Sequence, residues 1–80
     1  MQEEQEAVKV VDTIGLFCPE PIFRLRKALD EVKTGELIKL LTDDPAAEED
    51  VKRLLSRRGD KMVKYEVEGT VLKFTIMKVK

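Results

Sequence analysis

The chain carries one cysteine, Cys18, and its neighbours restrict the backbone. Pro19 and Pro21 follow it, with Glu20 between them. A proline biases the preceding residue away from helical angles, as a helix N-cap requires. Prolines are also tolerated in the first helical turn, because its amides have no partner within the helix. The pattern therefore predicts that Cys18 is the N-cap of a helix whose first residue is Pro19.

That position exposes the Cys18 thiol to two opposing electrostatic effects. The positive end of the helix dipole favours the thiolate, whereas the carboxylate of Glu20 disfavours a second negative charge. Because Pro21 has no N–H, the sulfur would chiefly accept a hydrogen bond from the amide of Glu20, and Arg24 and Arg26 would soften the effect of the carboxylate. We expect a rigidly placed, modestly activated thiol. A lone cysteine is more often a small buried hydrophobic residue, so the residues alone support a reactive and a structural Cys18 about equally.

Composition excludes several other kinds of chemistry. The chain has no histidine, so neither a Ser-His-Asp nor a Cys-His catalytic group can form within it. With one cysteine, only carboxylates are left to bind a metal ion, and none stand at ligand spacing, so we expect neither a metal nor a cofactor. A net charge of −1, with three Phe and one Tyr as the aromatic residues, argues against direct binding of nucleic acid.

The N-terminal segment, residues 1–6, is acidic and polar, which is not the pattern of a secretory signal. No apolar run approaches the roughly 18 residues that span a membrane. A single thiol persists best in a reducing compartment. We therefore expect a cytoplasmic protein that does not enter a membrane.

The hydrophobic pattern predicts the order βαβαββ in one domain, residues 1–80, with 1–6 as a flexible lead. The predicted elements are a strand at 8–11, a helix from 19 to Gly35, a strand at 36–42, a helix from 45 to Gly59, and a hairpin with strands 63–67 and 72–76 around Gly69. Each helix has one apolar stripe and the hairpin has one apolar face. These features favour an α+β fold: a two-layer sandwich with a mixed four-stranded sheet and both helices on one face.

Several single residues carry their own expectations. Asp44 is expected to cap the second helix, with Asp43 solvated. Asp12 is expected to organise the loop before Gly15. Phe17, beside the cysteine, is either an exposed docking contact or a core residue. The basic residues at 57, 58 and 61 fit a helix C-terminus better than an RNA site.

Residues 15–21, Gly-Leu-Phe-Cys-Pro-Glu-Pro, resemble the Cys-Pro-x-Pro signature of the TusA/SirA-like sulfur-carrier family. Further similar segments follow in the same order along nearly the whole chain, at 26–27, 43–46 and 74–78. The resemblance implies the same two-layer fold. It also implies that Cys18, supported by Pro19, Glu20 and Pro21, accepts a sulfane sulfur as a persulfide and passes it to the next thiol in a relay.

Such a carrier is a sulfurtransferase-type protein that acts with partner enzymes and is not a self-contained catalyst. The resemblance implies a donor such as a cysteine desulfurase or a rhodanese, and a thiol acceptor such as a DsrE-like protein. The pathway could be tRNA thiolation, molybdenum cofactor maturation or sulfur metabolism. Many relatives carry a histidine after the second helix, where this chain has Gly-Asp-Lys at 59–61, so any role of that histidine does not transfer.

The candidate partner contacts are four charged residues: Arg26, Lys27, Asp43 and Asp44. Each also has a structural explanation, as an exposed helix charge or as part of a helix start. Two other functions stay open. One is a thiol-based redox or regulatory interaction module, although a chain without a second cysteine cannot form an internal disulfide. The other, less favoured, is a small RNA-binding domain.

Overall fold

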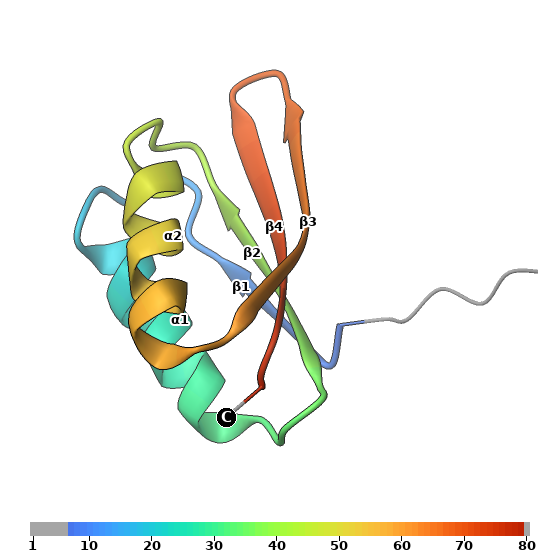
Figure 1. Ribbon diagram of the computed structural model, residues 1–80. Coiled ribbons are helices and arrows are strands. Elements are labelled where there is room, and N and C mark those ends of the chain that lie inside the picture. The colour runs from blue at the N-terminus through green and yellow to red at the C-terminus, as the bar shows by residue number, and fades with distance from the viewer. Residues whose placement is uncertain (1–6, 80) are drawn as a thin grey trace, which may run out of the picture.

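Strands and helices follow one another in the predicted order βαβαββ (Figure 1). The computed structural model describes residues 7–79, so the predicted flexible lead at 1–6 lies outside the described residues. The elements are β1 (Lys9–Asp12), α1 (Glu20–Glu31), β2 (Leu37–Thr42), α2 (Ala47–Arg58), β3 (Lys61–Glu68) and β4 (Val71–Met77).

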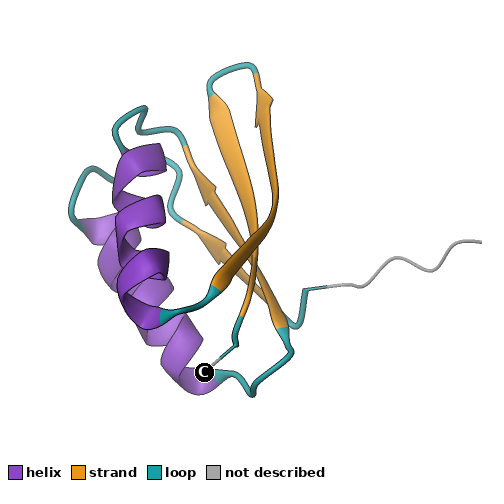
Figure 2. Cartoon of the chain, in the orientation of Figure 1, coloured by secondary structure: helices purple, strands orange, loops and turns teal. Residues whose placement is uncertain are grey.

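The four strands form one mixed sheet in the order β1-β2-β4-β3. β1 and β2 are parallel, because α1 connects them as a crossover, and the other two strand pairs are antiparallel. Figure 2 shows both helices on the same side of this sheet. The predicted α+β, two-layer architecture is therefore confirmed.

The core lies between the sheet and the two helices. Alternate residues of β2 and β4 point into it, and the register places Ile38 opposite Ile76 and Leu40 opposite Phe74. All four are fully buried. The helices contribute their apolar stripes to the same cluster, with Leu25, Ala28, Leu29, Val51 and Leu55. One apolar face per element is enough to close a two-layer core.

Two details differ from the sequence-based expectation. β3 contains a bulge at Val63, since Met62 pairs with Ile76 and Lys64 with Thr75. The bulge turns Val63 out of the core, where it is half exposed, and Met62 packs against the core instead. The first helix ends at Glu31, and its C-cap Val32 is already extended. The chain then turns at Gly35, which has a φ of 92°, before it enters β2.

The far end of α2 is closed as predicted and tied to the C-terminal segment. Gly59 adopts a left-handed conformation and donates its amide to the carbonyl of Leu55. The next residue, Asp60, has a fully buried side chain that accepts hydrogen bonds from Arg58 Nε at 2.8 Å and from the Val79 amide at 2.9 Å. Arg58 also pairs with Asp30 of α1. The basic residues at this helix end therefore include one with a structural task.

Candidate thiol site at the start of α1

Cys18 is exposed and lies in the loop between β1 and α1, one residue earlier relative to the helix than predicted. The N-cap is Pro19, which has no side chain able to cap, and α1 begins at Glu20. The amide of Glu20 donates to the carbonyl of Phe17 at 2.9 Å. The prediction that Cys18 is the N-cap and that this amide serves the sulfur is therefore wrong. The backbone of the loop satisfies that amide first.

Two carboxylates from the segment after β2 hold the thiol loop. Asp43 Oδ1 accepts from the Gly15 amide, and Asp44 Oδ2 accepts from the Cys18 amide, each at 3.0 Å. Asp44 also organises the turn before α2, because its Oδ1 accepts from the Ala46 amide at 3.0 Å. The N-cap of α2 is Ala46, so the prediction of Asp44 as N-cap and Asp43 as solvated is wrong. Both residues are only partly exposed and join two loops.

Parallel pairing explains why these loops meet. β1 and β2 run in the same direction, so the segments after them leave the sheet at the same end (Figure 1). The predicted order βαβ at the start of the chain is the available signal for this contact, because strands joined by a helical crossover run parallel. Asp12 contributes as expected, because its Oδ1 accepts from the Ile14 amide at 3.1 Å within the first loop.

Asp50, in the first turn of α2, contacts the sulfur directly. The sequence did not predict it as a residue of the thiol site. The Cys18 thiol donates to Asp50 Oδ2 at 3.2 Å, and Arg53 Nη1 donates to the other carboxylate oxygen, Oδ1, also at 3.2 Å. Asp50 is 32 residues from Cys18 along the chain, and its place among three consecutive acidic residues has a sufficient local explanation in the helix dipole. No local pattern singles it out from its neighbours.

These carboxylates change the expected acidity of the thiol. The hydrogen bond to Asp50 raises the pKa of the Cys18 thiol above its ordinary value, with smaller contributions from desolvation and from the negative charges of Asp50 and Asp44. Both carboxylates favour the neutral form because a thiolate beside them would be a second negative charge. The prediction of a modestly activated thiol is therefore wrong, and the responsible residue is Asp50. Glu20, which we expected to oppose ionisation, pairs with Arg24.

Large exposed apolar side chains lie in the thiol loop and on the start of α1. Phe17, next to Cys18, is 76% exposed. Of the two predicted positions, the surface and the core, it therefore occupies the surface. Ile14 in the same loop and Phe23 on the first turns of α1 are also large exposed hydrophobic residues. Large aromatic residues exposed beside a reactive group are typical of a surface that another protein covers.

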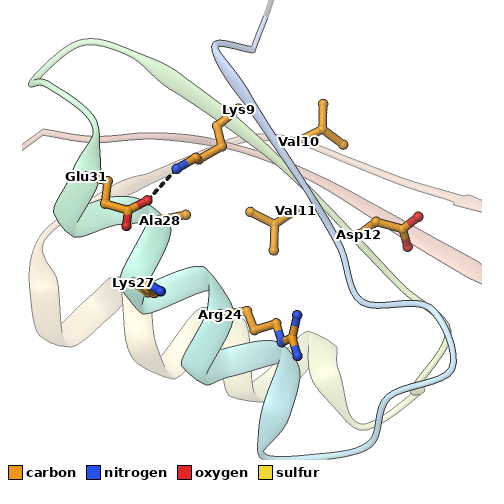
Figure 3. Close-up of a pocket in the computed structure, with 8 residues that line it drawn as sticks. All are labelled: Lys9, Val10, Val11, Asp12, Arg24, Lys27, Ala28 and Glu31. Atoms are coloured by element: carbon orange, nitrogen blue, oxygen red, sulfur yellow. Dashed lines mark hydrogen bonds and ion pairs between the residues drawn. The ribbon is translucent and has the colours of Figure 1, made fainter.

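The two predicted basic contacts on α1 lie on different sides of the helix. Lys27 lines a groove of about 580 Å³ between β1 and α1, together with Arg24 and Glu31 (Figure 3). Figure 3 also shows Lys9 of β1 linked to Glu31 across this groove. Arg26 is exposed and is not among the groove residues. Cys18 does not line the groove either, so the groove and the thiol are separate features.

Among residues 7–79, no group of three or more acidic or cysteine side chains could hold a metal ion. Within the same part of the chain, no helix has the length and apolar character to cross a membrane.

Comparison with known proteins points to one family. The family model described as "Sulfurtransferase TusA" matches residues 9–78. A putative sulfur carrier protein of Archaeoglobus fulgidus is 50% identical over 74 residues, which cover 91% of this chain and 96% of that protein. The sulfur carrier protein TusA of Buchnera aphidicola is 36% identical, over 86% of this chain and 87% of its own.

The putative sulfur carrier protein YrkI of Bacillus subtilis is likewise 36% identical, over 88% of this chain and 93% of its own. The fold agrees as well. The crystal structure of the SirA-like protein from Desulfitobacterium hafniense superposes with a TM-score of 0.80 at 25% identity, covering 91% of this chain and all of that one. With the family model, these relatives and the fold in agreement, the chain belongs to the TusA family of sulfur carriers.

Proposed function

We propose that Cys18 is the atom-carrying residue: it accepts a sulfane sulfur as a persulfide and relays it to the thiol of an acceptor protein. The observation that carries the proposal is an exposed sulfur in a loop held by side chains from another segment. Pro19, Glu20 and Pro21 fix the path of the chain from this loop into α1. A sulfur carrier acts between a sulfur donor and a sulfur acceptor, and an exposed thiol can reach the sites of both.

The transfer conserves electrons and needs no cofactor. The Cys18 thiol loses its proton, and the thiolate attacks the outer sulfur of a persulfide on the donor. A bond forms between Cys18 Sγ and the transferred sulfur, while the donor's S–S bond breaks and leaves a donor thiolate, which takes up a proton. The second transfer repeats this exchange, with the acceptor thiolate attacking the outer sulfur now held on Cys18.

The exposed aromatic residues suggest where the partners touch. Phe17 and Phe23 would bury their rings against the donor or the acceptor, and Arg26 lies on the same helix as Phe23. We propose a cysteine desulfurase or rhodanese as donor and a DsrE-like protein as acceptor. Asp43 and Asp44 support the loop from within and are less suited to partner contact than the sequence suggested, because their carboxylates already accept backbone amides.

Intact mass spectrometry tests the proposal. The purified chain, incubated with a cysteine desulfurase and cysteine, should gain the mass of one sulfur atom, and dithiothreitol should remove that gain. Cys18→Ser should gain nothing. Phe17→Ala keeps the thiol and serves as a second variant: it should be loaded by a small polysulfide at the wild-type rate but more slowly by the enzyme. If the wild-type chain stays unmodified with several desulfurases and rhodaneses, the carrier function is wrong.

The alternative of a redox or regulatory module predicts a Cys18-dependent dimer on non-reducing gels after mild peroxide treatment. The raised pKa of Cys18 counts against it, because the thiolate is the form that peroxide oxidises.

A further inference from the structure

The contact between Asp50 and the sulfur opposes the ionisation that a sulfur carrier needs. A nucleophilic cysteine works as its thiolate, yet here the thiol donates its proton toward a carboxylate at 3.2 Å. Asp44, whose Oδ2 accepts a hydrogen bond from the Cys18 amide, adds a second negative charge near the thiol. Arg53, the cation that contacts Asp50, is itself paired with that carboxylate, and Arg24 on the first turns of α1 is paired with Glu20. The loop therefore holds the empty sulfur in its less reactive form.

We propose that Asp50 is a positioning residue that favours the protonated, less reactive form of Cys18 when the carrier is empty, and that loading with sulfur removes this restraint. The inference rests on the proposed function, because it concerns the persulfide that the carrier would hold. It assigns Asp50 a task that depends on the state of Cys18.

The chemistry of the loaded state supplies the switch. A persulfide is a stronger acid than the thiol from which it forms, so at neutral pH it has already lost its proton: Cys18–S–SH gives Cys18–S–S⁻ and H⁺. No thiol proton is then left to donate to Asp50. The carboxylate and the terminal sulfur carry the same charge and repel each other, which favours rotation of the outer sulfur away from α2 and toward solvent.

The consequence is a carrier whose sulfur is less nucleophilic when empty and more nucleophilic when loaded. An empty thiol that is mostly protonated resists oxidation and alkylation while the protein diffuses between partners. Once loaded, the outer sulfur is anionic and no longer anchored to Asp50. The Asp50 carboxylate therefore accepts a hydrogen bond from the empty thiol but repels the anionic persulfide.

Alkylation of the full chain by iodoacetamide across a range of pH measures the effect on the empty thiol. Asp50→Asn should shift the pH midpoint of the reaction downward and raise its rate at neutral pH by about two- to fivefold, as expected for removal of one exposed charge interaction. Arg53→Gln should do the opposite, because it removes the cation that partly neutralises Asp50. Glu49→Gln, which removes the same charge from the adjacent position on α2, is the matched control and should leave the profile unchanged.

The loaded state gives the second measurement. Each chain is first loaded with inorganic polysulfide, and alkylation of its persulfide is then followed by mass spectrometry. The rate should be the same for wild type and Asp50→Asn, because the outer sulfur is anionic in both. The inference is overturned if Asp50→Asn alkylates no faster than wild type when empty, or if it speeds the loaded form equally. A chain that enzymes fail to load would instead refute the proposed function, while the empty-state measurement would still test Asp50.

Discussion

Removing the Asp44 carboxylate is expected to release the Cys18 backbone from the turn between β2 and α2. Asp44→Ala deletes two hydrogen bonds to backbone amides, one from Cys18 and one from Ala46, both at 3.0 Å. A net value of about 0.5–1.5 kcal/mol for each bond gives a loss of about 1–3 kcal/mol in the free energy of unfolding. Because Asp44 is partly exposed and water can replace part of each bond, the result should fall in the lower half of that range.

The matched variant is Asp44→Asn, which keeps one oxygen acceptor and places an N–H₂ group where the second oxygen was. It can satisfy one of the two amides, so its stability should lie between those of wild type and Asp44→Ala. Urea denaturation followed by circular dichroism measures this order as a fall in midpoint at constant slope. In a domain of this size each kcal/mol lowers Tm by about 4–8 °C. If Asp44→Ala unfolds at the wild-type urea concentration, the two hydrogen bonds do not stabilise the loop.

Three further outcomes follow from other parts of the molecule. Asp60→Ala should lower the free energy of unfolding by about 2–4 kcal/mol in urea titrations, because it strips a buried carboxylate from the Val79 amide and from its ion pair. Phe17→Ala should leave Tm within about 2 °C of wild type, since an exposed ring contributes little to packing. Acid should destabilise the chain: lysine partners lower the pKa of Glu31 and Glu68, so the stability that they add is present above the ordinary carboxyl pKa and is lost as pH falls through the lowered values. Thermal unfolding at pH 6, 4 and 3 checks the sign, and 1 M salt should weaken the effect.

Most of the fold could be predicted because each element shows its period in the sequence. Apolar residues three and four apart mark α1, and alternation marks β4, whose Leu72, Phe74 and Ile76 all point into the core. The bulge at Val63 could not be predicted, since it depends on how β3 pairs with β4 and not on the residue types within β3. A one-residue offset in pairing moves a side chain to the opposite face.

The position of the thiol site could be predicted from the sequence, but the direction of the shift in its pKa could not. The residues around Cys18 indicate a restricted loop before a helix, and that is what forms. The pKa of the Cys18 thiol is raised chiefly by Asp50, which local sequence assigns to the dipole of its own helix. Electrostatic effects act through space, so a residue distant in the chain can outweigh one two positions away. Glu20, the near neighbour, instead turns back to Arg24 along α1.

The competition between the helix end and the carboxylates at Cys18 can be resolved with a double variant, Asp44→Asn with Asp50→Asn. The N-terminus of α1 favours the thiolate, and it remains when both carboxylates are removed. Each carboxylate acts in the opposite direction, since both raise the pKa of Cys18. The double variant should therefore show the lowest pH midpoint for alkylation, below either single variant, and 1 M salt should bring all the profiles closer together. A midpoint equal to that of Asp50→Asn would mean that the charge of Asp44 does not reach the sulfur. A midpoint at the wild-type value would mean that neither carboxylate controls the thiol.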